Sequence, residues 1–454
     1  MRVRTIFRLW LPLAISFELM MCEGPALQGA IGRLPDSALH LAAWGLMMQL
    51  SLLIESPVIM LLSTAIALVK DAGTFYALRR FMLNLLIGCT VLTAAVAFTP
   101  LFDLIASRVM GQPAAIVAVT RPALRIMLLW TAAIGWRRFF QGVLVRSGAT
   151  RMVSWGTCVR LTAAITTAVS LTMWGKLPGV QVGACALMAA VITEAIATTL
   201  FALPVVRAKV LSVVSNQAPP TQRDIWNFHL PLAATTVLTL LALPLTSAAL
   251  ARLPMPKETL AAWAVASMAV LVLRGWGLAL HEITVSQARD FTTRPALYRF
   301  AWTVGLVTSG VTALLVATPL LNAYLRYVVH LPENLYGMAR LGVGACVLLP
   351  LITALASWSR GLLVADGATN KVYRGMGLNL ITHSAALLVG VLLNGNGMLV
   401  AAGAFTLSSL FEFGYLVYNA AQSAQKQKQI AVVADYERVE IATLSEVEII
   451  AGSS

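Results

Sequence analysis

The sequence predicts an all-α polytopic membrane protein, with about twelve transmembrane helices in two parallel six-helix repeats around a central cavity. Three observations lead to this fold class. The chain of 454 residues is 59% hydrophobic and 11% charged, and its mean hydropathy of +0.80 lies far above that of soluble domains. Apolar stretches of about 20 residues, enough to cross a bilayer as a helix, recur along the chain. Finally, much of the sequence repeats at one constant spacing.

The apolar stretches fall into two sets of six. They are expected near residues 8–30, 41–69, 81–101, 122–145, 153–174 and 180–204, and near 226–250, 260–286, 300–322, 337–363, 373–393 and 398–420. Their apolar runs are continuous and do not alternate, which disfavours a β-barrel. The basic, apolar start is typical of a signal peptide, but Glu18 and Glu23 interrupt the apolar run and no clean cleavage site appears, so a retained first helix is expected.

Basic residues predict the orientation. They crowd the N-terminus, the central linker, the C-terminal tail and every second connection, while the alternate connections are poor in them. The positive-inside rule then places both termini in the cytoplasm, with the chain in the inner (plasma) membrane. The net charge of +14 is partly this topology signal, and no nucleic-acid partner is predicted.

A tandem duplication is visible in the sequence. The segment "QGVLVRSGATRMV" at 141–153 recurs as "RGLLVADGATNKV" at 360–372, so that Gly148 and Gly367 are related by an offset of 219; "LPLA", "RLP" and "LAAW" recur at the same offset. An even number of spans separates the copies, so the halves are expected to be parallel repeats. The predicted boundaries are 1–206 and 225–421 for the two bundles, 207–224 for a cytoplasmic linker and 422–454 for a cytoplasmic acidic tail.

Ionisable residues inside spans are costly, by about 2.5 to 3.5 kcal/mol near the bilayer centre, and are therefore functional candidates. The substrate-binding candidates are Arg137, Arg138, Arg160, Arg274 and Glu55. The coupling or cavity candidates are Glu18, Glu23, Glu194, Glu282, Glu412 and His383.

Comparison of equivalent positions in the two repeats groups these candidates into pairs. Glu55 and Arg274 are related by the offset of 219, so opposite charges occupy one repeat position and could form a pair across the cavity that breaks as the halves move. The alternative is that each is paired within its own bundle. Glu194 and Glu412 are related at offset 218, and the shared charge indicates either a structural pairing with Arg or a role in ion coupling.

Three arginines have no basic counterpart in the second half, where Ala356, Ser357 and Asn379 stand at the positions of Arg137, Arg138 and Arg160. This asymmetry favours a role as substrate ligands, because a guanidinium group suits carboxylate or phosphate oxygens. For Glu18 and Glu23, cation binding, neutralisation of an Arg and a wet vestibule stay open. His383 is expected to be a hydrogen-bonded core group, with proton transfer as the alternative.

No catalytic constellation, metal motif or cofactor motif is present, so an enzyme is not expected. The five cysteines are dispersed singly in apolar spans, which is typical of small core residues. The expected partners are a small anionic substrate, the bilayer and a coupling proton or sodium ion, and the expected state is a monomer.

Three stretches carry a family resemblance: "LPLAISFELMMCEGPALQGAIGRLP", "FFQGVLVRSGATRMV" and "LPLAATTVLTLLALPLTSAALARLP". With the two six-helix halves, they resemble the progressive ankylosis (ANK) protein family within the multidrug/oligosaccharidyl-lipid/polysaccharide (MOP) exporter superfamily. The resemblance implies export of organic or phosphorylated anions, such as pyrophosphate, nucleotides or citrate, by alternating access. The alternatives are a cation-coupled multidrug (MATE-like) exporter, a lipid-linked oligosaccharide flippase, and a membrane scaffold that transports nothing.

Overall fold

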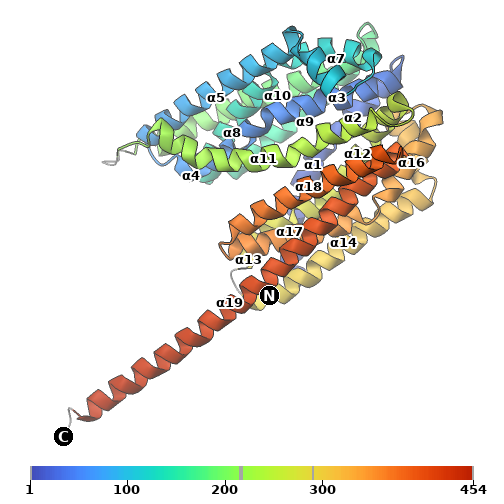
Figure 1. Ribbon diagram of the computed structural model, residues 1–454. Coiled ribbons are helices and arrows are strands. Elements are labelled where there is room, and N and C mark those ends of the chain that lie inside the picture. Colours follow the sequence, from blue (N-terminus) through green and yellow to red (C-terminus); the bar gives the residue numbers. More distant parts are fainter. Residues whose placement is uncertain (1–2, 214–217, 289–290, 452–454) are drawn as a thin grey trace.

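The computed structural model describes residues 3–213, 218–288 and 291–451, and every regular element within them is a helix. Figure 1 shows the helices gathered into two elongated lobes that meet at one end and separate toward the other. This arrangement confirms the predicted all-helical fold class.

Each half is a series of long helices joined by short turns. The first half contains α1 (Val3–Met21), α2 (Glu23–Gly32), α3 (Ser37–Ile59), α4 (Leu61–Leu68), α5 (Ala72–Phe98), α6 (Leu101–Asp103), η1 (Leu104–Val109), α7 (Ala114–Ile126), η2 (Met127–Leu129), α8 (Trp130–Arg146), α9 (Thr150–Trp174) and α10 (Gly179–Lys209). The second half contains α11 (Gln222–Leu250), α12 (Pro256–Leu278), α13 (Leu280–Gln287), η3 (Phe291–Thr293), α14 (Arg294–Ala317), α15 (Leu320–Ala323), η4 (Tyr324–Val329), η5 (Glu333–Leu335), α16 (Tyr336–Ala345), α17 (Leu349–Ala365), α18 (Thr369–Leu392) and α19 (Gly397–Ala451).

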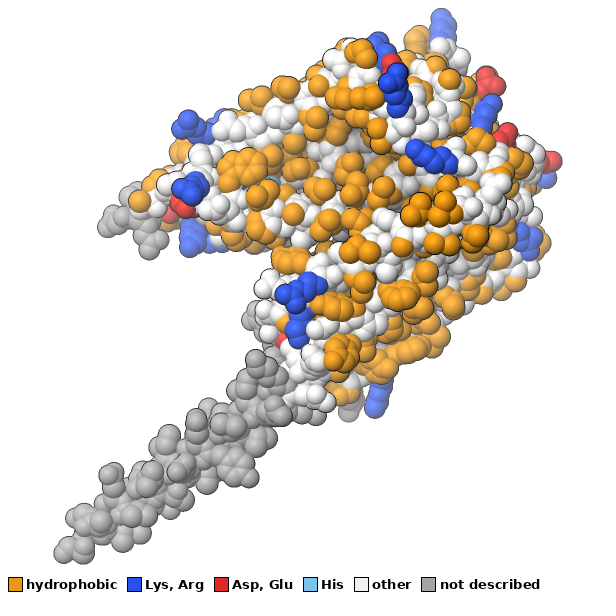
Figure 2. Space-filling model, viewed as in Figure 1, with side chains coloured by type: hydrophobic (Ala, Val, Ile, Leu, Met, Phe, Trp, Pro, Cys, Tyr) orange, Lys and Arg blue, Asp and Glu red, His pale blue; other side chains and the backbone are white. Residues whose placement is uncertain are grey.

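The helices suit a membrane. Within the described residues, 11 helical segments are long and apolar enough to cross a bilayer, and α9, with 25 residues, supplies one more long helix. Apolar side chains such as Ile87, Leu200 and Ile381 are more than half exposed, and Figure 2 shows such side chains over the middle of the molecule with Lys and Arg toward the helix ends. The chain is therefore a membrane protein, in which these side chains face lipid.

The helix boundaries follow the repeat. The first and last residues of α3 and α12 are related by the offset of 219, and so are those of α8 and α17. The first residues of α10 and α19 are related by an offset of 218, which accommodates the one-residue gap seen in the sequence. The two copies of the repeated turn place Gly148 (φ 78°) and Gly367 (φ 74°) in the left-handed region, a conformation that glycine adopts without the steric cost of a Cβ.

The first helix of each half packs against the other half. On α1, Trp10 lies 5.8 Å from the ring of Trp276 in α12 and 5.3 Å from that of Phe300 in α14. On α11, the ring of Trp226 lies 5.0 Å from that of Phe81 in α5, and Figure 1 shows α11 running along the first-half helices. The first helix of each half thus packs on the other half, although α11 also contacts α18 of its own half through Thr246 and His383. The predicted boundaries 1–206 and 225–421 do not show this packing.

The lobes are held together at one end, here called the closed end. Arg252 donates from Nη2 to the carbonyl of Val109 (2.6 Å) and from Nη1 to that of Met110 (3.0 Å). Gln28 donates to the carbonyl of Ala264 (2.9 Å). These bonds cross from one half to the other.

A direct backbone approach completes the closed end. A methyl group on Gly29 or Gly32 would overlap the carbonyl oxygen of Val328 or Val329 in η4. The opposite end, where α4 and α13 finish, is here called the open end, and Figure 2 shows the molecule hollowed between the lobes on that side.

The predicted linker and tail lie partly outside the described residues. α10 ends at Lys209 and α11 begins at Gln222, and residues 214–217 between them are outside the description. α19 extends to Ala451 as a helix of 55 residues, but the side chains of 426–451 and residues 452–454, which carry the acidic tail, also lie outside it. The linker and tail assignments stay predictions.

Candidate functional site

A cavity of about 560 Å³ lies between the two halves. Apolar side chains form most of its wall, including Trp44, Met268 and Phe405. Against this wall stand eight charged residues: Arg137, Arg138, Arg160, Arg274, Arg360, Glu23, Glu55 and Glu412. The repeat therefore does bring charges from both halves to one central cavity.

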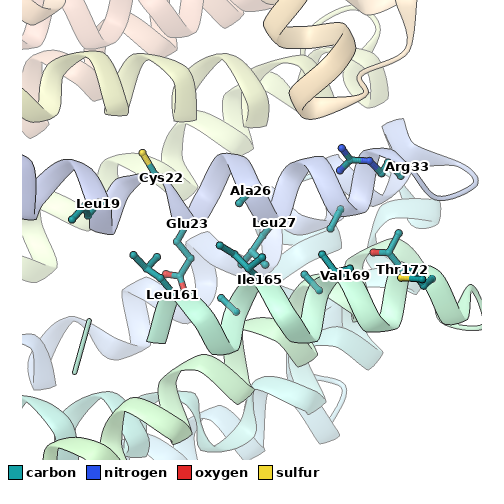
Figure 3. Close-up of a pocket in the computed structure, with 14 residues that line it drawn as sticks. Leu19, Cys22, Glu23, Ala26, Leu27, Arg33, Leu161, Ile165, Val169 and Thr172 are labelled. Carbon is teal, nitrogen blue, oxygen red and sulfur yellow. The ribbon is translucent and has the colours of Figure 1, made fainter. Parts of the chain in front are cut away.

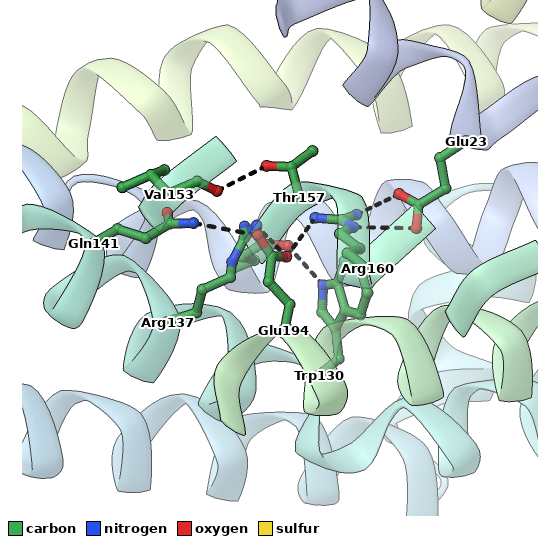
Figure 4. Close-up of polar contacts among 9 residues, drawn as sticks. Glu23, Trp130, Arg137, Gln141, Val153, Thr157, Arg160 and Glu194 are labelled. Atoms are coloured by element: carbon green, nitrogen blue, oxygen red, sulfur yellow. Dashed lines mark hydrogen bonds and ion pairs between the residues drawn. The ribbon is translucent and has the colours of Figure 1, made fainter. Parts of the chain in front are cut away.

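Glu194 organises the charges of the first half. Its carboxylate is fully buried and accepts from Nη1 of Arg137 (2.6 Å) and Nε2 of Gln141 (3.2 Å). A guanidinium nitrogen of Arg160 lies 3.6 Å away. Figure 4 shows these donors converging on the carboxylate from α8 and α9. Glu194 thus has the pairing with Arg that was one of its two predicted roles.

Arg160 joins this cluster to α2. It donates from Nε to Oε1 of Glu23 (3.1 Å) and from Nη2 to Oε2 of the same carboxylate, forming a two-point pair (Figure 4). Planar guanidinium and carboxylate groups favour this geometry, which fixes the orientation of both side chains. Glu23 begins α2, directly after the break at Cys22, so the ion pair ties the start of α2 to α9.

Glu55 is held by an uncharged group. Its Oε2 accepts from the indole Nε1 of Trp130 at 2.6 Å, and the residue is 4% exposed. Arg274 lines the same cavity, but no ion pair joins Glu55 to Arg274 in this conformation among the described residues. The repeat position therefore brings the opposite charges to one cavity without pairing them here.

The second half repeats the carboxylate cluster with different partners. Glu412 accepts from Nε (2.8 Å) and Nη2 (2.5 Å) of Arg360 and from Nδ2 of Asn379 (2.9 Å). Arg360 and Asn379 occupy the repeat positions of Gln141 and Arg160. Each half therefore uses the same two helix positions to hold the carboxylate of its last helix.

Arg138 on α8 and Arg274 on α12 differ from the other cavity arginines. Within the described chain, neither has a carboxylate oxygen within 4.0 Å. The Nε of each is buried and has no hydrogen-bond partner. Both side chains are partly exposed, and they line a cavity with a mostly apolar wall. A guanidinium group without a counter-ion in such surroundings carries a desolvation cost, which a bound anion would reduce.

The charge count of the site is positive. Five guanidinium groups face the cavity, while three carboxylates line it and a fourth, Glu194, lies behind the wall with its partners. With every group ionised, five positive and four negative charges leave a net charge of +1.

A second, more apolar space lies beside the cavity, between α2 and α9. Its volume is about 530 Å³, and Glu23 and Leu27 line both spaces. Figure 3 shows the side chains of Leu161, Ile165 and Val169 facing α2 across it. We call this space the α2–α9 groove; it extends from Glu23 to Arg33 near the closed end.

Comparisons with known proteins find similarity in structure alone. No family model and no curated protein matches the sequence. An inward-facing multidrug resistance MATE family transporter of the MOP superfamily superposes with a TM-score of 0.66 at 13% identity, covering 91% of this chain and 98% of its own. The lipid II flippase MurJ, in an inward closed conformation, gives 0.70 at 11% identity, covering 90% and 87%. A MOP superfamily transporter from Pyrococcus furiosus gives 0.65 at 15% identity, covering 93% and 95%.

The chain shares its fold with these solved structures. These identities are too low to carry over a substrate or a mechanism. The fold neighbours are transporters and a flippase, and at these identities the likeness concerns the fold alone. The narrower resemblance to the ANK family is not confirmed by these comparisons.

The remaining predicted residues lie away from the cavity wall. Glu18 on α1 is buried, and its carboxylate abuts Gly275 of α12. His383 is fully buried and contacts Thr246 Oγ1 at 2.8 Å, as expected for a hydrogen-bonded core group. Glu282 is exposed on α13. No group of three or more His, Cys, Asp or Glu that could hold a metal is present in the described part of the chain.

Sequence reasoning missed two residues of the cavity wall, Arg360 and Trp130, and one residue behind it, Gln141, which bonds to Glu194. Arg360 lies at the end of a predicted span, where an arginine is ordinarily assumed to reach the membrane surface, and Gln141 and Trp130 carry no charge. A signal was nevertheless available for Arg360 and Gln141, because polar residues stand at this one repeat position in both halves. Trp130 gave no such signal, since Leu349 is its counterpart.

Proposed function

We propose that this protein is a secondary transporter that moves organic or phosphorylated anions by alternating access between its two halves. The observation that carries the proposal is the pair Arg138 and Arg274. They come from opposite halves, line one central cavity, and lack a carboxylate partner within the described chain. An anion bound between them would supply the missing counter-charge to both halves at once.

The other cavity arginines already have carboxylate partners. Arg137, Arg160 and Arg360 are each paired with a glutamate, so their charges are largely compensated and their side chains are fixed. A site whose surrounding groups are locked in place loses little conformational entropy when a ligand binds. The paired arginines therefore form a fixed part of the cavity wall, and the unpaired Arg138 and Arg274 bind the anion.

Alternating access would use the two ends of the molecule. The open end carries the connections that are rich in Lys and Arg, such as Lys70, Arg79 and Arg80, and by the positive-inside rule it faces the cytoplasm, as do both termini. An anion would enter there, and the closed end would separate as the halves rock. We further propose location in the inner (plasma) membrane, a monomeric state, and coupling to a proton or sodium ion.

The resemblance to the ANK family narrows the substrate to pyrophosphate, nucleotides or citrate-like acids. The positive balance of the cavity supports this choice. For the P. furiosus transporter, too, the polarity of the binding pocket has been linked to function: its pocket has reverse polarity, which suggests a different function.

The test is a flux measurement with the purified full-length chain in liposomes. Labelled pyrophosphate and citrate should cross only when the protein is present, and unlabelled anion should compete. Ethidium, a cationic dye, should cross no faster than in empty liposomes. Ethidium flux without anion flux would overturn the proposal and support a cation-coupled multidrug exporter.

The multidrug alternative requires carboxylates that are free to bind a cation. Glu23, Glu194 and Glu412 are each engaged by arginine, and Glu55 accepts from Trp130. Glu18 forms no ion pair within the described chain, but it does not line the cavity. The arrangement favours an anion over a cation as the transported species.

A lipid-linked flippase is a second candidate, favoured by one specific observation. The α2–α9 groove adjoins the arginine cavity at Glu23 and Leu27 and is lined mainly by apolar side chains, so a lipid tail could lie in it while an anionic head occupies the cavity. Scrambling of a fluorescent lipid-linked pyrophosphate, with no flux of free pyrophosphate, would favour this candidate over the first.

A further inference from the structure

A smaller space lies beside the central cavity, toward the closed end. This space, here called the end chamber, has a volume of about 180 Å³ and is lined by Gln28, Gln49, Trp44, Trp263, Arg274 and Phe405, among others. Arg274, Trp44 and Phe405 also line the central cavity, so the two spaces adjoin along these side chains. By the share of liquid volume that one water occupies, about 30 Å³, the end chamber has room for about six waters, and hence for one ring system.

Aromatic side chains make up much of its wall. Trp44 and Trp263 occupy one repeat position in the two halves and are 3% and 5% exposed. The rings of Trp263 and Phe405 are stacked, with centroids 5.8 Å apart and an interplanar angle of 27°. Such walls hold flat rings well, because stacking retains contact over a whole ring face.

Two hydrogen-bond acceptors in this wall have no donor. Gln28 is 1% exposed, and its amide nitrogen is used on the carbonyl of Ala264, while its Oε1 is buried without a partner. The Oε1 of Gln49 is likewise buried and unpartnered. An unsatisfied buried acceptor costs free energy that a ligand with an N–H group would recover.

The arginine at the mouth adds charge to this pattern. Arg274 lines both spaces, and its Nε lacks a partner. The chamber therefore has an aromatic wall with two unpartnered acceptors, and Arg274 stands where it adjoins the central cavity, whose wall also contains Arg138. A ligand that matches this arrangement carries a planar ring bearing N–H donors, attached to an anionic group.

We propose that the end chamber is a subsite for a nucleobase-like ring, so that the preferred substrate is a nucleoside phosphate with its ring in the chamber and its phosphate at Arg274 and Arg138. The proposal rests on the proposed anion-transport function. A glutamine amide offers an acceptor beside a donor, the combination that pairs with the edge of an aminopurine, and Gln49 is a glutamine of the chamber wall whose Oε1 has no partner. A sugar phosphate without a base would fill the arginine site only.

The experiment compares three anions with the full-length protein in liposomes: adenosine 5′-monophosphate, ribose 5-phosphate and inorganic pyrophosphate. We expect the KM of the nucleotide to be at least tenfold lower than that of the sugar phosphate. In Gln49→Met, which keeps the length of the side chain and removes its amide, most of this difference should disappear, with the other two anions unaffected. Gln222→Met is the matched control, because Gln222 bonds to the carbonyl of Ala77 away from the chamber.

A binding measurement separates the two proposals. The nucleotide should raise the thermal unfolding temperature of the purified protein more than ribose 5-phosphate does, since a ligand stabilises the folded state according to its affinity. Equal KM values and equal thermal shifts would overturn the subsite while leaving anion transport intact, and so would a uniform loss of all three fluxes in Gln49→Met. Absence of flux for every anion would overturn the proposed function, and the subsite with it.

Discussion

Gln141 and Arg360 stand at the same position of the two repeats, and each donates to the carboxylate of the last helix in its own half. The distance is 3.2 Å from Gln141 to Glu194 and 2.8 Å from the Nε of Arg360 to Glu412. The first half adds Arg137 and Arg160 around its carboxylate, whereas Arg360 is the cation paired with Glu412. The repeat preserves the geometry of the two clusters and changes their charge.

This difference predicts that Arg360→Gln, which copies the first-half residue, destabilises the protein. Glu412 is 2% exposed in its side chain and would keep Asn379 as its polar partner. Since the Arg360 side chain is 25% exposed, the free energy of unfolding should fall by about 2 kcal/mol, less than on breaking a fully buried ion pair. Thermal unfolding in detergent measures it. The double variant Arg360→Gln/Glu412→Gln should recover much of the loss, and equal losses in the single and double variants would contradict this account.

Glu194→Gln should destabilise the protein by about 3 kcal/mol, because it leaves Arg137 buried without its carboxylate. Arg160 keeps Glu23 as a partner. Adding Arg137→Met to Glu194→Gln removes the uncompensated charge and should restore stability, which thermal unfolding again measures. No recovery in the double variant would mean that the carboxylate acts through some other contact.

Arg138→Gln and Arg274→Gln should each raise the KM for pyrophosphate about 10- to 100-fold, the expected loss of one charge-assisted contact of about 1.5 to 3 kcal/mol. The unfolding temperature should not fall, since neither arginine forms an ion pair in the described chain. Arg121→Gln serves as the control, because Arg121 pairs with Asp103 at a more exposed position. Unchanged flux in both cavity variants would place the anion elsewhere.

The double swap Arg274→Glu/Glu55→Arg should not rescue the transport lost in Arg274→Glu. Glu55 accepts a hydrogen bond from Trp130 and, within the described chain, forms no ion pair with Arg274 in this conformation. The effects of the two substitutions on flux should therefore be independent. Flux in the single and double variants gives the comparison. Clear rescue would show that the pair forms in another state of the transport cycle.

Gly32→Ala should loosen the closed end. The added methyl group would overlap the carbonyl oxygen of Val329, and backbone cannot yield as a flexible side chain can. Distances between spin labels at Asp36 and Glu333, in a background without the five native cysteines, should lengthen. Gly337→Ala is the control, since a methyl group there meets no atom within 4 Å; equal distances in both variants would argue against a gate at this contact.

Ile165→Trp tests the α2–α9 groove. Ile165 lines the groove and is 51% exposed, while Ile196 lies outside it on α10 and is 57% exposed. Ile165→Trp should leave flux of free pyrophosphate unchanged, as should Ile196→Trp. Scrambling of lipid-linked pyrophosphate that is blocked by Ile165→Trp and not by Ile196→Trp would favour a flippase function over the transport of free anions.

Much of the fold could be read from the sequence. Hydropathy reports a property of each segment by itself, so the membrane spans were predictable, and the offset of 219 predicted the matching limits of α3 and α12. The one-residue gap before Glu412 was also visible. These features depend on local composition and on comparing the chain with itself, and neither requires knowledge of which helices touch.

The pairing of charges was decided by tertiary structure. Arg160 finds Glu23, 137 residues away, and this pair depends on the rotation of α9 and α2 about their axes, which hydropathy does not specify. The packing of α1 and α11 on the opposite halves, and the placing of Arg360 in the cavity, depend likewise on packing between distant helices. The sequence by itself predicted a series of about twelve membrane-spanning helices in two copies. Only the packed structure decided which arginines are neutralised and which stay free, because an ion pair requires two side chains to meet in space.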